Sequence, residues 1–423
     1  MHRPVSVQQL DRITLAMGLP EGYFYDLYIE NYIIERSPNM RRIEPLLYRC
    51  AELDKLDAIR RMVGAIMDKL LYSPRLFDIA ETLFAQGRHA AALLLYENVA
   101  EGEKYQHSER LAVCQYRIFT IQIGDDQSRN LKASSIFEAF VERLDEIDQL
   151  DALKDLANVY RSLHNWDKVN EMARKMRGKA EIQYSLQHQE KRKSREYEKK
   201  TKGPLFGYIA YADLLCACVS EARGDYEQAL QYTYAYADLD WVIETDEDTR
   251  HWIGLFQQWA EGNTYVNKLL SGDTSVLPEY VEYIAVTSIA NNNEKLSKLL
   301  NVIIAANQYK VDVNDILQRF ETEIDSITQH QPSADMYTYQ VVPEHSTLFK
   351  YELAKYYLNW GRYSHGFKYL LDVLAKSLAI NKETFFIRCV RLFEQFKEFA
   401  DVQAHAKYEI LVSKGQKEKL FYY

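Results

Sequence analysis

A short turn pattern recurs along this chain between segments that have helical periodicity. Gly224 is followed by Tyr226 at position +2 and by Ala229 at +5, and Gly361 is followed by another small residue, Gly366, at +5. A glycine of this kind ends one helix, and the small residue five positions later lets the next helix pack closely against the first. Because such a helix pair buries its apolar face only against another pair, the pattern predicts a stacked array of antiparallel helix pairs.

Other turns carry the same offsets with different residues. Gly87 is followed by Ala92 at +5 and by Tyr96 at +9, where a large side chain fills the space between neighbouring pairs. Asp54 lies about one repeat upstream of Gly87, since the repeats that this pattern resembles, tetratricopeptide repeats, have a period of roughly 34 residues. The remaining anchors of the series are Gly124 and His164.

The composition agrees with a helical chain. Glycine and proline are scarce, with 16 and 9 residues among 423, which favours long helices over turn-rich β structure. No segment shows the alternation of a strand followed by a hairpin turn. We therefore predict an all-α fold, a tetratricopeptide-like αα superhelical solenoid.

The first residues of the chain follow a separate pattern. Ser6 is a good N-cap, Leu10, Ile13 and Met17 share one helical face, and Gly18 can close the helix. This string resembles the fourth helix of the Cro/C1 (XRE-type) helix-turn-helix domain.

In domains of that type the recognition helix, which lies in the DNA major groove, comes before the helix just described. We therefore interpret residues 1–30 as the C-terminal remnant of an XRE-type helix-turn-helix domain that lacks its N-terminal part, and we expect no DNA-contacting residue in this chain. The apolar face of the remnant helix is expected either to pack on the first repeat through Phe24 and Tyr28 or to fray.

The rest of the chain divides at a polar segment. Residues 31–186 are interpreted as a first tetratricopeptide-like array and residues 204–423 as a second. Residues 187–203 contain few apolar side chains and are predicted to form a charged linker or helix extension. The basic run Lys191–Arg195 is flanked by Glu190, Glu196 and Glu198, and this mixed charge favours a solvated linker over a phosphate-binding site. A second polar break spans residues 329–344.

Charge and motifs exclude several classes of function. The chain has 52 Lys and Arg against 61 Asp and Glu, a net charge of −9, so most of it is not a nucleic-acid surface. Phosphate-binding glycine loops, His-Glu-x-x-His and Gly-x-Ser-x-Gly do not occur in the sequence, so we expect no enzymatic activity and no cofactor.

The cysteines indicate a reducing compartment. Cys216 and Cys218 lie in an apolar helical segment with no second pair at zinc spacing, so we expect buried thiols and no metal. The five cysteines have no disulfide-framework spacing, and the sequence has no signal peptide and no long apolar run. We therefore expect a cytoplasmic protein that does not contact membranes.

Tyrosine is abundant, with 32 residues against 17 phenylalanines. Packing between repeats accounts for most of them; alternatively, their rings and hydroxyls line a groove that binds an extended peptide. In a tetratricopeptide array the first helix of each pair lines the concave side, where amide side chains can bond a peptide backbone. The candidate peptide-binding residues on such helices are Tyr116, Arg117, Asn158, Arg161, Tyr211 and Asp213.

The whole chain resembles the peptide-sensing and related cytoplasmic regulators of Gram-positive bacteria, through the strings Arg3–Thr14, Gly18–Tyr28 and Ala91–Ala100. The resemblance implies a sequence-specific transcription regulator whose repeat domain forms a homodimer and binds a peptide or protein ligand. DNA would then be bound only through the missing N-terminal helices. The alternative is a tetratricopeptide interaction or inhibitor protein that does not bind DNA.

Overall fold

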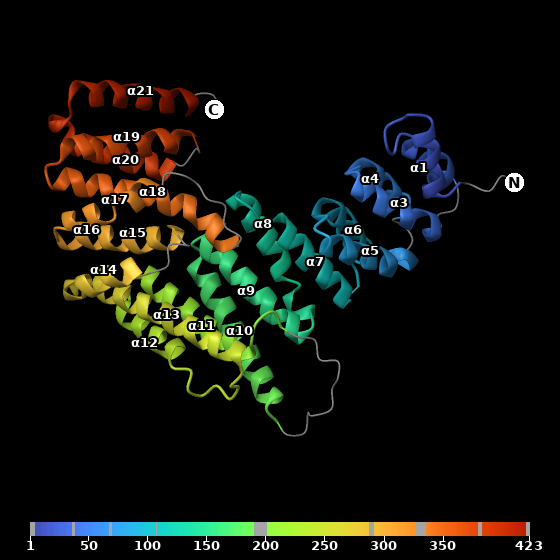
Figure 1. Ribbon diagram of the computed structural model, residues 1–423, viewed down its shortest axis with the longest axis horizontal. Helices are drawn as coiled ribbons and strands as arrows, with labels where there is room; N and C mark the ends of the chain where they lie inside the picture. Colours follow the sequence, from blue (N-terminus) through green and yellow to red (C-terminus); the bar gives the residue numbers. More distant parts are fainter. Residues whose placement is uncertain are drawn as a thin grey trace. The chain divides into compact units, whose positions relative to one another are not determined.

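The computed structural model confirms a helical fold over the part of the chain that it describes (Figure 1). The described residues are 5–35, 39–66, 70–106, 108–189, 201–286, 292–326, 336–379 and 383–419, and within these ranges there is no strand. Two compact units are formed, the first from Met1–Leu163 and Gly178–Gly203 and the second from His164–Arg177 and Pro204–Tyr423. The chain passes between the units after residue 163, after residue 177 inside one helix, and after residue 203. The arrays predicted from the sequence span residues 31–186 and 204–423.

The first unit is a succession of short helices. They are α1 (Val7–Ala16), α2 (Tyr25–Ile29), the π-helical turn η1 (Glu30–Ile34), α3 (Met40–Glu52), α4 (Leu56–Gly64), η2 (Leu70–Tyr72), α5 (Ser73–Ala85), α6 (His89–Gly102), α7 (Glu109–Gln122), α8 (Gln127–Glu138), η3 (Val141–Arg143) and α9 (Glu146–Ser162). Helix α10 (Trp166–Gln187) contributes its C-terminal part to this unit and its N-terminal part to the second.

The second unit continues with further helices, many of which lie side by side in Figure 1. They are α11 (Leu205–Ala222), α12 (Tyr226–Ala237), α13 (Glu247–Leu270), η5 (Thr274–Val276), α14 (Leu277–Val286), α15 (Asn292–Tyr309), α16 (Asn314–Arg319), α17 (Glu321–Ser326), α18 (Met336–Asn359), α19 (Tyr363–Ala379), α20 (Glu383–Phe396), η6 (Lys397–Phe399) and α21 (Val402–Lys419). Helix α11 has the length and apolar composition of a membrane-spanning segment, but 72% of it is buried in the protein, as in the core helix of a globular domain.

The turns predicted from the sequence share one backbone geometry. Asp54, Gly87, His164, Gly224 and Gly361 all have positive φ, between 53° and 76°. At Gly224, for example, the next N–H donates to the carbonyl of Ser220 at 2.9 Å, which is the bond that closes a helix in the Schellman motif. These five anchors therefore lie at turns between helices.

One predicted anchor has a different geometry, and two further turns were missed. Gly124 is not among the positive-φ residues; its N–H and carbonyl instead bond the side chain of Asn130, at 3.0 and 2.7 Å. Conversely, Gly272 and Lys310 have positive φ at the ends of α13 and α15. They are followed at +5 by Leu277 and Asp315, so they lack the small residue that marks Gly87, Gly224 and Gly361.

The small residues at +5 lie where paired helices meet. Ala92 on α6 and Ala229 on α12 are fully buried, and α6 and α12 pack against α5 and α11 respectively. At Gly366 on α19, an added Cβ would lie 3.1 Å from the backbone nitrogen of Leu358 on α18. The backbones of these helices therefore approach so closely that only a small side chain fits.

Helix α1 packs on the helices that follow it, although by another face than we predicted. Its buried residues are Val7, Leu10 and Thr14, whereas Ile13 and Met17 are exposed by 43% and 59%. The expectation that Leu10, Ile13 and Met17 form the packed face is thus wrong for two of the three. Phe24 and Tyr28 belong to the apolar cluster that contains Val7 and Leu10, as expected for a packed helix.

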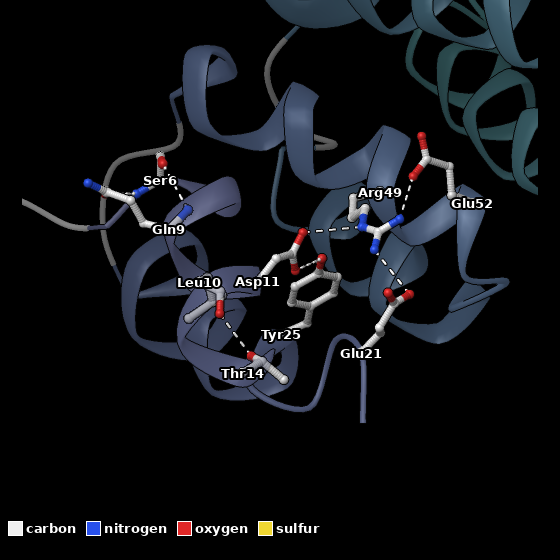
Figure 2. A network of polar contacts seen from close by, with 9 residues as sticks. All are labelled: Ser6, Gln9, Leu10, Asp11, Thr14, Glu21, Tyr25, Arg49 and Glu52. Carbon is white, nitrogen blue, oxygen red and sulfur yellow. Dashed lines mark hydrogen bonds and ion pairs between the residues drawn. The ribbon is translucent and has the colours of Figure 1, made fainter. Parts of the chain in front are cut away.

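A polar network explains this rotation of α1 (Figure 2). Asp11 accepts a hydrogen bond from the buried hydroxyl of Tyr25 at 2.5 Å and pairs with Arg49 on α3 at 3.2 Å. Arg49 also pairs with Glu21 and Glu52, at 3.1 and 2.7 Å. Since Asp11 lies on the same side of α1 as Val7, Leu10 and Thr14, these bonds turn that side toward α3.

Replacing Asp11 with alanine is expected to loosen α1 by about 1–3 kcal/mol, because it leaves the buried Tyr25 hydroxyl without its acceptor. Amide hydrogen exchange should accelerate about 5- to 160-fold in α1, the factor that corresponds to this free energy, and stay unchanged in α9. Asp57→Ala is the matched control, since Asp57 forms an exposed pair with Arg60 and its loss should cost under about 0.5 kcal/mol. Equal protection of α1 in both variants would contradict the role of the network.

Candidate functional site

Three helices of the first unit, α5, α7 and α9, are joined by polar side chains. Arg117 on α7 donates from Nε and Nη2 to the carboxylate of Glu81 on α5, both at 2.9 Å. The neighbouring Tyr116 donates its hydroxyl to Asp155 on α9 at 2.6 Å. We call Glu81, Tyr116, Arg117 and Asp155 the α5–α7–α9 network.

The α5 side of the network is centred on Glu81. Besides Arg117, this carboxylate accepts the hydroxyl of fully buried Tyr96 at 2.5 Å. Burial, reinforced by the bond to Glu81, raises the pKa of Tyr96 above its ordinary value. The Arg117 guanidinium lies 4.7 Å from the centroid of the Phe84 ring, a cation–π distance. The Arg117 guanidinium thus contacts both the carboxylate of Glu81 and the ring of Phe84.

The α9 side of the network is centred on Asp155. Its partner Tyr116 is buried and stacks on Phe137, with ring centroids 5.1 Å apart. Burial raises the pKa of the Asp155 carboxyl, while the hydrogen bond from Tyr116 and the charge of Lys202 act in the opposite direction. Asp151, one turn earlier on α9, is also buried and lies 3.7 Å from Lys154. This face of α9 therefore carries two carboxylates that are partly removed from water.

The remaining candidate residues of the first unit lie further along α9. Asn158 and Arg161 are both half-buried, and Asn158 follows Asp151 and Asp155 at helical spacing, on the same face. The structure thus places Tyr116, Arg117, Asn158 and Arg161 on two helices that the Tyr116–Asp155 bond connects. Contact of any of them with a peptide stays a prediction.

The other two candidates belong to the second unit. Tyr211 is half-buried on α11, and Asp213 is buried there and pairs with Arg177 on α10. Because they are two positions apart, their side chains leave α11 in different directions. The buried Asp213 carboxylate is paired with Arg177 within the second unit.

Glu81 and Asp155 were not predicted from the sequence, although a signal for them exists. Arg117 and Glu81 are 36 residues apart, and Tyr116 and Asp155 are 39 apart. Similar separations occur in other bonds between helices, such as 37 for Lys179 and Glu142. These spacings are close to one helix-pair repeat, so the repeat indicates in which part of the chain a partner lies but does not single out the residue.

The described part of the chain contains no group of three or more His, Cys, Asp or Glu side chains that could hold a metal ion. Cys216 is buried and Cys218 half-buried. Burial raises the pKa of the Cys216 thiol to about 11 and that of Cys50 to about 12, so these thiols are protonated and unreactive near neutral pH.

The comparisons with known proteins do not place the chain in a family. No family model matches it, and no match to it was found among curated proteins.

Proposed function

We propose that this protein is a transcription regulator of the XRE/tetratricopeptide type, whose repeat domain binds a peptide or protein partner and dimerises in the cytoplasm. The observation that carries the proposal is the α5–α7–α9 network, in which successive first helices of a repeated helix array present polar side chains on connected surfaces. Recurrent turns of one geometry and polar bonds one repeat apart support a tetratricopeptide-like array.

The N-terminal helix supports the regulator part of the proposal. Ser6 and Gln9 form a reciprocal capping box, with bonds of 2.9 and 3.2 Å, and Gly18 ends α1 with a φ of 65°. Through Asp11, α1 is held against α3. In an XRE-type domain, a helix in this position supports the recognition helix and does not enter the groove. Sequence-specific DNA binding would therefore require helices that precede α1 in such domains.

Asn158 is the best-placed residue for a peptide backbone. Its amide can donate and accept, as a peptide unit requires, and it lies on the face of α9 that carries the network. Arg161 would pair with a carboxylate of the ligand. A carboxylate at the Nε/Nη2 edge of Arg117 would have to compete with Glu81, which already accepts a hydrogen bond from each of these two nitrogens.

The experiment is a selection of peptides from a random displayed library on the full chain, followed by affinity measurement with the fluorescently labelled winner. Asn158→Ala is expected to weaken binding by about 1–2 kcal/mol, or about 5–30-fold, through lost hydrogen bonds. Gln231→Ala is the control, because Gln231 is an exposed amide on α12. Equal affinity of the wild type and the double variant Asn158→Ala, Arg161→Ala, with unchanged circular dichroism, would refute this site.

A further inference from the structure

A lysine from a distant part of the chain lies at the α9 side of the network. The ammonium nitrogen of Lys202 is 5.8 Å from the centroid of the Tyr116 ring. Its positive charge lowers the pKa of the Asp155 carboxyl, against the larger effect of burial. Lys202 is itself exposed. It sits in a short turn in which the Thr201 hydroxyl donates to the carbonyl of Gly203 at 2.6 Å. The turn thus presents a cation to the network.

The surroundings of this ammonium group suit a cation. Tyr116 offers an aromatic ring, whose face attracts positive charge at distances up to about 6 Å. Asp155 offers a carboxylate in a partly dehydrated position, where opposite charges interact more strongly than in water. Tyr116 is held in place by its hydrogen bond to Asp155 and by stacking on Phe137. The ring and the carboxylate are therefore positioned independently of Lys202.

Lys202 is suited to leave this position. It is exposed although its partners are buried or half-buried, so its charged group, and not the packing of its side chain, holds it there. A second ammonium or guanidinium group could make the same interactions without any change in α7 or α9. Asn158 lies less than one turn beyond Asp155 on the same face, within reach of the backbone of a ligand whose basic side chain takes that place.

We infer that Tyr116 and Asp155 form a binding site for a basic side chain, and that Lys202 occupies this site until a peptide with a lysine or arginine displaces it. The inference rests on the proposed function and adds the chemical class of the ligand. It also assigns Lys202 the part of an internal competitor. A ligand without a basic residue would leave Lys202 in place and gain nothing from Asp155.

The test compares peptide selection and affinity in variants of the full-length protein. Peptides are selected from the same random library on the Lys202→Ala protein and on the double variant Lys202→Ala, Asp155→Asn. The asparagine retains an acceptor for the Tyr116 hydroxyl and removes the charge. Lysine and arginine should be enriched among peptides from the first selection and not from the second.

Affinities of the most enriched peptide then isolate the competition. Lys202→Ala should bind it about 3–10-fold more tightly than the wild type, and Asp155→Asn should bind it at least 10-fold more weakly. Lys104→Ala is the matched control, because Lys104 also lies over a tyrosine ring, that of exposed Tyr105, at 5.3 Å. The Lys104→Ala protein should bind the peptide with the same affinity as the wild type.

The outcomes separate this inference from the proposed function. If Asn158→Ala weakens binding but Lys202→Ala and Asp155→Asn leave affinity unchanged, the cation site is wrong and peptide binding stands. If basic residues are equally frequent in both selections, the assignment to Asp155 is wrong. Failure of every variant to select any peptide, with helical circular dichroism retained, would overturn both.

Discussion

Gly366→Val is expected to destabilise the second unit by about 3 kcal/mol. A Cβ at this position would lie 2.6 Å from Cγ of Leu358 and 3.1 Å from its backbone nitrogen. Leu358 is buried between α18 and α19, so its side chain has no open space to move into. Overpacking of this kind costs about 1–3 kcal/mol, and a β-branched residue falls at the upper end. Urea denaturation, with hydrogen exchange of α18 and α19 to locate the effect, measures the loss.

Gly254→Ala in α13 serves as the control for Gly366. No heavy atom lies within 4 Å of a Cβ built at Gly254, and that position is exposed in the interior of a helix. Alanine should therefore stabilise the unit by about 0.5–1 kcal/mol through helix propensity. The two substitutions should thus change the free energy of unfolding in opposite directions. A neutral effect of Gly366→Val would show that α18 and α19 do not approach as closely as described.

Glu81→Ala is expected to destabilise the first unit by about 2–3 kcal/mol. The carboxylate binds Arg117 through two bonds and also accepts the hydroxyl of buried Tyr96. Its removal leaves an arginine that is only 25% exposed without its counter-charge and a buried hydroxyl without an acceptor. Partial exposure of the pair keeps the cost below that of a fully buried one. Thermal and urea unfolding of the full chain measure the change in the free energy of unfolding.

The control for Glu81 is Glu44→Ala in the same unit. Glu44 also forms a two-bond pair with an arginine, Arg75, at 2.9 and 2.6 Å, but Arg75 is 53% exposed. Loss of this pair should cost under about 1 kcal/mol. Equal losses of stability in the two variants would mean that the bonds of Glu81 to Tyr96 and Arg117 contribute no more than an exposed ion pair.

The turns were the most predictable part of the molecule. At Asp54, Gly87, His164, Gly224 and Gly361 the sequence pattern located positive-φ residues, because this conformation depends on a few neighbouring residues. Lys310 has the same conformation without the pattern. A lysine adopts it only where the surrounding structure imposes it, so local sequence does not reveal such a turn.

The packed face of α1 shows the limit of periodicity. Leu10, Ile13 and Met17 satisfy helical spacing, as do Val7, Leu10 and Thr14. The second set is buried because Asp11 pairs with Arg49, 38 residues away. Spacing along one helix does not reveal which face has a polar partner elsewhere in the chain.

The all-helical fold, the five turns at positive-φ residues and the small residues at helix crossings could be predicted from the sequence, since each depends on backbone preferences over a few residues. Which polar side chains meet could not be predicted in this way, because it depends on how distant helices pack. Tyr116 and Arg117 were recognised as candidates, but their partners Asp155 and Glu81 lie 39 and 36 residues away on other helices. A charged side chain can pair with many others along a chain, and the packing of helices selects one of them.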